Sequence, residues 1–122
     1  MFEIMIRTHF AAAHQLDLTG RKCENLHGHN WKVEVFVRGD ALDHAGVLYD
    51  FGLLKKTVNS IMDELDHKFL NELEDIFPGG SPSSERIAVY IAKSLTGELP
   101  IGITVSKVNA WESDDSCASY IP

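Results

Sequence analysis

The sequence of 122 residues has little of several features that mark whole classes of protein. Its only two cysteines, Cys23 and Cys117, sit in unlike contexts, which excludes a disulfide framework and favours a reducing, cytoplasmic compartment. With 11 basic and 18 acidic residues, the net charge of −7 argues against nucleic acid or an anionic membrane as the main partner. No apolar run is long enough to span a bilayer, and the N-terminus lacks the layout of a signal peptide. The length, without repeats or linkers, indicates a single domain over residues 1–122.

Two stretches of alternating polarity bring three histidines to one side of a sheet. Residues 2–14 alternate, and the apolar face extended by one step reaches His14. Residues 27–38 alternate as well, and counting back by twos from the apolar face reaches His29 and His27. If the two strands pair antiparallel through the loop between them, His14 approaches the other two histidines. The spacing therefore predicts three imidazoles on the core-facing side of two neighbouring strands.

The rest of the chain predicts two helices and two more strands. The helices are expected over 51–65 and from Ser81–Glu85 to Gly97, and the strands over 101–112 and 118–121. Asp50 is a good N-cap for the first helix, because its carboxylate can accept from first-turn amides. The alternation of the third strand slips near Ser106, which indicates a bulge. The order predicts an α+β fold: a four-stranded, mostly antiparallel sheet with two helices on one face.

The three histidines indicate a metal site, and Cys23 leaves its type open. Zinc suits three imidazoles better than calcium or magnesium, which prefer oxygen ligands. If Cys23 is a fourth ligand, the site is closed and structural. If it is not, three histidines leave an open catalytic position, and Cys23 becomes a nearby thiolate that can take a proton. Spacing alone does not choose between these two sites.

Other residues could join the site, each with an ordinary alternative. The Asp66 carboxylate could orient the neighbouring His67 imidazole, or His67 could simply end a helix favourably. Glu112, at the end of a hydrophobic strand, could accept paired N–H donors from a heterocycle that carries an amino group, or it could be an ordinary solvated acid. The helix start at Ser84 and Glu85 offers backbone amides to an anion, or merely a cap.

Taken together, these residues resemble the 6-pyruvoyl-tetrahydropterin synthase superfamily, and within it the 6-carboxytetrahydropterin synthase branch of the queuosine pathway. The resemblance covers nearly the whole chain. Its most specific segments are Phe10–His14, Cys23–His29 and Asp66–His67. Weaker support comes from Val47–Phe51, Pro82–Glu85 and Trp111–Glu112. Ser83 stands where members often have threonine, so the hydroxyl is retained.

The resemblance implies a role for each candidate residue. It implies that zinc is bound by His14, His27 and His29. It implies that Cys23 is the general base, with His67 as its relay partner and Asp66 beside it. The residue at the position of Glu112 grips the pterin ring in this family and is also described as part of the relay. Ser84 and Glu85 fall where the family contributes further pterin contacts.

The resemblance also implies an assembly and a reaction. In the tunnelling fold of this family, three subunits close their sheets into a barrel and two trimers stack, which predicts a homohexamer with active sites at subunit interfaces. The implied reaction converts 7,8-dihydroneopterin triphosphate into 6-carboxy-5,6,7,8-tetrahydropterin, acetaldehyde and triphosphate. The spacing from Cys23 to His27 fits the carboxy-type enzymes. The alternatives are a 6-pyruvoyl synthase, a lyase that leaves a 6-hydroxymethyl pterin, and a non-enzymatic oligomeric domain stabilised by zinc.

Overall fold

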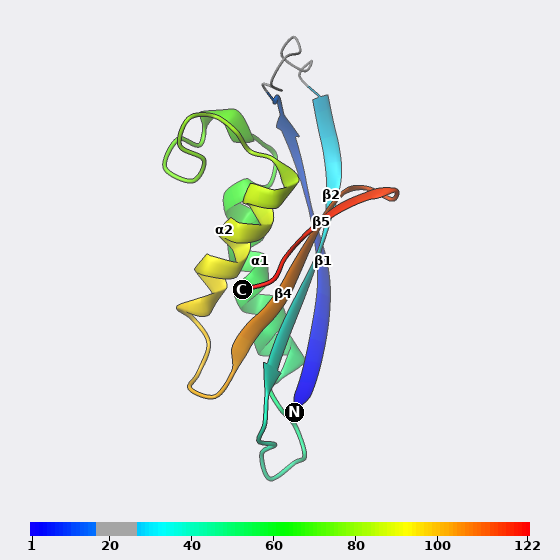
Figure 1. Ribbon diagram of the computed structural model, residues 1–122, viewed down its shortest axis with the longest axis vertical. Helices are drawn as coiled ribbons and strands as arrows, with labels where there is room; N and C mark the ends of the chain where they lie inside the picture. The colour runs from blue at the N-terminus through cyan, green and yellow to red at the C-terminus, as the bar shows by residue number, and fades with distance from the viewer. Residues whose placement is uncertain (17–26) are drawn as a thin grey trace.

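The computed structural model describes residues 1–16 and 27–122, which form a sheet covered on one face by two helices (Figure 1). The strands are β1 (Phe2–His14), β2 (His27–Gly39), β3 (Lys68–Phe69), β4 (Thr104–Ser113) and β5 (Ser116–Tyr120). The helices are α1 (Phe51–Leu65), the 3-10 turn η1 (Leu70–Glu72) and α2 (Ser84–Thr96). The predicted α+β class, with both helices on one face, is confirmed. No helix in the described part of the chain is long and apolar enough to cross a membrane.

The sheet differs from the predicted one by an additional strand. Its order is β3-β1-β2-β4-β5, and β3 pairs parallel with β1 while the other pairs are antiparallel. The prediction of four strands was therefore wrong in this detail, whereas the mostly antiparallel pairing is confirmed. Two residues, Lys68 and Phe69, are too few for an alternating pattern, and they pair only because α1 ends beside the edge of β1. There the Asp66 carboxylate accepts from the Ala11 N–H, and the His67 N–H donates to the Ala11 carbonyl.

Local signals in the sequence set most other features. Asp50 caps α1 by accepting from the Leu53 N–H, and Ser83 caps α2 by accepting from the Arg86 N–H. The predicted bulge is confirmed at Ser106, because Phe36 pairs with Lys107 whereas the next residue of β2 pairs with Val105. The two strands β1 and β2 pair over their full length, from Phe2 opposite Gly39 to His14 opposite His27.

The core lies between the sheet and the helices. The inward face of β2 and the inward faces of the helices are fully buried, with Trp31, Val33, Val35, Leu54, Val58, Leu65, Ile87, Ile91 and Leu95 at 0% exposure. His14 continues this face and is also at 0% exposure, whereas ordinary histidines are rarely so deeply buried. His14 and His29 therefore belong to the edge of the core, where β1 ends and β2 begins. These ends of the two strands lie at the upper end of Figure 1.

Candidate metal centre

Two of the predicted histidines meet a glutamate at the end of the core. His14 Nε2 lies 3.3 Å from one Glu112 carboxylate oxygen, and His29 Nε2 lies 3.5 Å from the other. One ligand atom from each of the three residues lies within 4.8 Å of the others, a spacing that could hold a metal ion. Strand pairing produces this arrangement, because His29 stands opposite Ala12 on the face that also carries His14.

The surroundings of His14 fix which ring nitrogen is available to a metal. His14 Nδ1 lies 2.9 Å from the carbonyl oxygen of Pro82, which can only accept, so Nδ1 carries the proton. In the neutral ring Nε2 therefore carries a lone pair, and it faces a Glu112 oxygen 3.3 Å away. Two acceptors at this distance need a proton or a cation between them. A backbone carbonyl behind a metal-binding histidine is the usual partner that sets ring orientation, so the group fits a metal ion.

Aromatic packing holds the two imidazoles in place. The rings of His14 and His29 meet edge to face, with centroids 5.2 Å apart. Each also meets the Trp31 indole edge to face, at 5.1 Å from His14 and 5.5 Å from His29. Because Trp31 is fully buried, neither ring can turn without disturbing the core. The nitrogen atoms that would bind the metal are therefore held in position before it arrives.

Two predicted members of the site, His27 and Cys23, lie at the edge of the described residues or outside them. The backbone of His27 pairs with that of His14, but the His27 side chain is not among the described parts of the chain. Cys23 falls in 17–26, outside the described residues. Their roles as third ligand and general base stay predictions.

Asp66 and His67 form a pair of their own, apart from the metal group. The Asp66 carboxylate lies 2.9 Å from His67 Nδ1, and the His67 side chain is 83% exposed. Hydrogen bonds to Asp66, from the Ala11 backbone N–H first and from His67 second, lower the pKa of that carboxyl. His67 also has a positive φ of 58°, uncommon for a residue other than glycine, at the point where α1 turns into β3. Within one chain, therefore, Asp66 and His67 contact each other as a relay pair would, but they are not part of the group of His14, His29 and Glu112.

Glu112 also borders a hollow whose lining includes neither His14 nor His29. This hollow, of about 210 Å³, is lined by Ser84, Glu85, Glu112, Ser116, Cys117 and Ala118. The three residues predicted to contact a pterin therefore share one space, at the start of α2 and the end of β4. Ser116 and Cys117 were not predicted to line it, because only the pairing of β4 with β5 brings them there. Trp111 pairs with Cys117, and the register shifts between Trp111 and Ser113, so Glu112 stands at a bulge.

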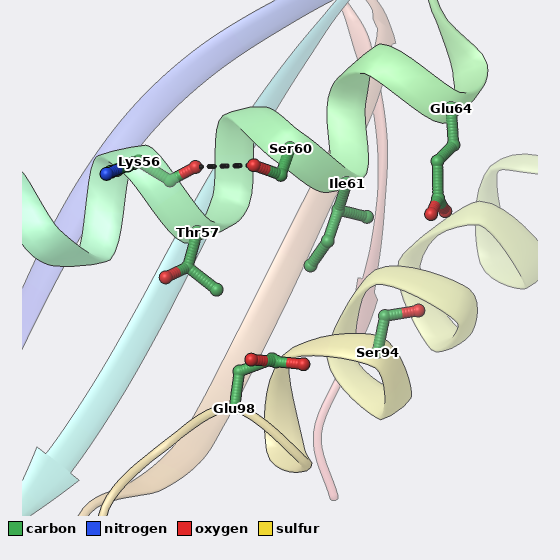
Figure 2. A pocket seen from close by; sticks show the side chains of 7 residues that line it. All are labelled: Lys56, Thr57, Ser60, Ile61, Glu64, Ser94 and Glu98. Atoms are coloured by element: carbon green, nitrogen blue, oxygen red, sulfur yellow. Dashed lines mark hydrogen bonds between the residues drawn. The ribbon is translucent and has the colours of Figure 1, made fainter.

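A larger groove, of about 500 Å³, lies between α1 and α2 and is separate from this site (Figure 2). It is lined by Lys56, Thr57, Ser60, Ile61, Glu64, Ser94 and Glu98, with no histidine or cysteine among them. Its polar groups are largely committed, since the Ser60 hydroxyl donates to the Lys56 carbonyl and the Tyr90 hydroxyl donates to Glu64. The chemistry therefore points to the histidine cluster as the functional site rather than to this groove.

Comparison with known proteins identifies the family. The family model described as 6-pyruvoyl tetrahydropterin synthase matches residues 3–122. The chain belongs to this family. The resemblance inferred from the motifs is thereby confirmed.

Relatives in the 6-pyruvoyl tetrahydropterin synthase family carry several activity names. A dihydroneopterin monophosphate aldolase of Pyrococcus furiosus is 34% identical over 112 residues, which cover 92% of this chain and 90% of that protein. A 6-carboxy-5,6,7,8-tetrahydropterin synthase of Synechocystis is 37% identical over 116 residues, 91% of this chain and 86% of that protein. The solved structure of Caenorhabditis elegans 6-pyruvoyl tetrahydropterin synthase has a TM-score of 0.84 at 25% identity, and covers 99% of this chain and 95% of that one. These names have in common the processing of a pterin.

On the outer face of the sheet, Glu34 supports the strand that carries Glu112. Its carboxylate accepts from Arg7 Nη2 at 2.8 Å, from Trp111 Nε1 at 2.7 Å and from Asn109 Nδ2 at 3.2 Å. Burial raises the pKa of Glu34, but the hydrogen bonds from these partners outweigh it and lower the pKa from 4.5 to about 2. Trp111 directly precedes Glu112, so this network anchors the end of β4 in the 6-pyruvoyl tetrahydropterin synthase fold.

Replacing Glu34 by glutamine is expected to lower the free energy of unfolding at pH 7 by about 1–2 kcal/mol, because three partner side chains lose a charged acceptor. The loss is limited because Arg7 is half exposed, so that solvent screens its charge. The folded pKa of about 2 lies below the ordinary 4.5. The stabilisation is therefore complete above pH 4.5 and is lost as the pH falls towards 2. Urea unfolding at several pH values should show the difference between wild type and Glu34→Gln shrinking in acid. Glu3→Gln, on the same face but exposed, is the control; equal losses in both variants would contradict the expectation.

Proposed function

We propose that this protein converts 7,8-dihydroneopterin triphosphate into 6-carboxy-5,6,7,8-tetrahydropterin, with uptake of one water and release of acetaldehyde and triphosphate, as a step in queuosine and 7-deazaguanine synthesis. Membership of the pterin family supports the substrate class. The observation that carries the proposal is the grouping of His14, His29 and Glu112, whose ligand atoms lie within 4.8 Å of one another and could hold a metal ion. The proposed enzyme is a zinc-dependent carbon–carbon lyase.

The residues proposed to hold zinc are His14, His29 and, from its backbone position opposite His14, His27. Neutral imidazole nitrogens suit zinc, and three protein ligands leave a position for the substrate. Zinc bound there would act as a Lewis acid that makes the side-chain hydroxyl groups of the substrate more acidic. The hydrogen bond from His14 Nδ1–H to Pro82 would keep Nε2 directed at the metal.

Glu112 is proposed to hold the pterin ring. A carboxylate can accept two N–H bonds from the aminopyrimidine part of a pterin, and such charge-assisted pairs also orient the ligand. Glu112 contacts both histidines and also lines the hollow with Ser84 and Glu85, which supports this role. A ring held in the hollow would direct its 6-substituent towards the histidines, which is the positioning that the reaction requires.

Cys23 is proposed as the general base, with Asp66 and His67 as its relay. The Asp66 carboxylate would hold the His67 ring with Nδ1–H towards it and leave Nε2 to exchange protons. Because the pair lies apart from the metal group of its own chain, we propose that it serves the site of a neighbouring subunit in a homohexamer. The strongly exposed His67 side chain supports an interface role.

The relative named dihydroneopterin monophosphate aldolase favours a second candidate. At 34% identity across 92% of this chain, it supports cleavage of a dihydropterin side chain to a 6-hydroxymethyl product. Both candidate reactions break a carbon–carbon bond of the same side chain and would use the same metal, base and ring-binding residues. The same site could therefore serve either substrate, and the product must decide.

The test is product identification. Protein loaded with zinc is incubated with 7,8-dihydroneopterin triphosphate and, separately, with the monophosphate, and the products are identified by mass spectrometry. We expect 6-carboxytetrahydropterin and acetaldehyde from the triphosphate. A 6-hydroxymethyl or 6-pyruvoyl pterin would overturn this assignment in favour of the corresponding activity. No conversion of either substrate would favour a domain in which zinc serves only stability.

Replacing Glu112 by glutamine separates ring binding from metal binding. The amide keeps one acceptor but loses the charge, so KM for the pterin is expected to rise about 10–100-fold. The zinc dissociation constant, measured by competition with a chromophoric chelator, should change little. Glu98→Gln, in the groove of Figure 2, serves as the remote control. A large loss of zinc affinity with an unchanged KM would instead make Glu112 a metal ligand.

A further inference from the structure

An asparagine outside the proposed site makes three hydrogen bonds that converge on it. The Asn71 side-chain oxygen accepts from the Gln15 backbone N–H at 2.8 Å. Its side-chain nitrogen donates to the Gln15 carbonyl at 2.7 Å and to the Gly80 carbonyl at 3.0 Å. These partners fix the orientation of the amide, because a backbone N–H can bond only its oxygen and two carbonyls can bond only its nitrogen. Each polar atom of the Asn71 side chain is therefore matched to a partner of the opposite kind.

The two partners of Asn71 flank the two halves of the His14 hydrogen bond. Gln15 directly follows His14 in the chain, and Gly80 precedes Pro82 by two residues. The end of β1 and the segment 80–82 are therefore joined twice. His14 donates to the Pro82 carbonyl, and Asn71 bridges Gln15 and Gly80. Releasing Asn71 would free the end of β1 from the segment that carries the carbonyl acceptor.

Asn71 also continues the pairing along the edge of β1. Asp66 and His67 bond the Ala11 backbone, and β3 pairs with the next two residues, Ala12 and Ala13. At Gln15 the side-chain amide of Asn71 bonds both the N–H and the C=O, as a neighbouring strand would. The edge strand is thus held up to the residue after the proposed metal ligand.

The segments that carry Asn71 and Gly80 are themselves held in place by burial and by backbone hydrogen bonds. Leu70, next to Asn71, is fully buried, and Phe77, between Asn71 and Gly80, is 1% exposed. The segment from 77 to 83 is held by the Gly80 N–H donating to the Phe77 carbonyl and the Ser83 N–H donating to the Ser81 carbonyl. Gly80 has a φ of +67°, a conformation that side chains rarely adopt, so its carbonyl reaches Asn71 from a turn that needs glycine.

We propose that Asn71 is a positioning residue for the metal site: its amide clasps Gln15 to Gly80 and so holds His14 against the Pro82 carbonyl, with Nε2 aimed at the metal. This inference rests on the proposed function for the identity of the site. Interactions behind metal-binding histidines typically change metal affinity by about 10–100-fold when they are removed. Asn71 acts one step further away, through the backbone on both sides of that interaction.

Replacing Asn71 by aspartate tests the clasp with almost no change in shape. The carboxylate keeps the acceptor for Gln15 N–H but loses both donors, and it sets an anionic oxygen against two carbonyls. We expect the zinc dissociation constant to rise about 10-fold or more. We also expect the visible spectrum of the cobalt-substituted protein to change, a signature that general loss of stability would not produce. Asn59→Asp is the matched control, because the Asn59 side-chain oxygen only accepts, from the Thr8 hydroxyl.

Unchanged zinc affinity and cobalt spectrum in a folded Asn71→Asp protein would overturn the proposal. Should that variant fail to fold, Asn71→Ala removes the same bonds without adding charge and is judged by the same measurements. In the wild type, zinc is expected to slow amide exchange at Gln15 and Gly80 together, and protection that stops at His14 and His29 would also overturn it. Normal zinc binding in Asn71→Asp, together with conversion of pterin, would refute the role of Asn71 but not the proposed function. Weakened zinc binding in Asn71→Asp, together with a wild-type protein that converts no pterin, would refute the proposed function alone.

Discussion

Replacing His14 by alanine is expected to lower the zinc affinity of the protein by more than about 100-fold, because a metal ligand is lost outright rather than a group behind it. The buried Pro82 carbonyl also loses its donor, which should reduce the free energy of unfolding by about 1–3 kcal/mol. Zinc content by elemental analysis and affinity by chelator competition measure the first effect. Thermal unfolding of metal-free protein measures the second, independently of zinc.

His29→Ala and His44→Ala complete this test. The His29 side chain is partly exposed, so its replacement should weaken zinc binding with a smaller loss of stability in the metal-free protein. His44 is exposed and lies outside the metal group, so its replacement should leave zinc binding unchanged. A His14→Ala protein that retains stoichiometric, tightly bound zinc would refute the assignment of the site.

Replacing Cys23 by alanine is expected to lower turnover strongly while the protein keeps its zinc and its fold. Loss of a general base typically costs about 10²–10⁴-fold in rate. The expected pattern is therefore a fall in kcat of that size, with zinc content and melting temperature close to those of wild type. Steady-state assays with 7,8-dihydroneopterin triphosphate, elemental analysis and thermal unfolding on the same preparation give the three values.

The opposite pattern has a different meaning. If Cys23→Ala loses zinc and melting temperature together, the cysteine is a fourth ligand and the site is a closed, structural one. If the variant keeps zinc, fold and full activity, Cys23 is neither ligand nor base, and the relay through His67 loses its starting point. Each outcome is visible without knowledge of the structure around Cys23.

The alternation of the strands was enough to predict much of the site. Counting by twos along residues 2–14 and 27–38 put His14 and His29 on one face, and full-length pairing of β1 with β2 brings them together. The N-cap at Asp50, the start of the second helix within Ser81–Glu85 and the bulge at Ser106 were also predictable, because each depends on a few neighbouring residues.

The remaining features depend on contacts between distant segments. β3 has only two residues, and it forms because α1 delivers them to the edge of β1. The Pro82 carbonyl that orients His14 is a backbone atom, which no pattern of side chains reveals. Asn71 reads as an ordinary polar residue of a turn until Gln15 and Gly80 are seen on either side of it. Glu112 was predicted to hold a ring, but its approach to two histidines follows from the placement of β4 beside β2.

The central claim is that His14, His27 and His29 hold a catalytic zinc ion that Cys23 does not ligate. X-ray absorption at the zinc edge of the purified wild-type protein tests it most directly. We expect only nitrogen and oxygen neighbours, at about 2.0–2.1 Å, with the multiple-scattering pattern of imidazole. A sulfur neighbour at about 2.3 Å would show that Cys23 binds the metal, and would contradict the account.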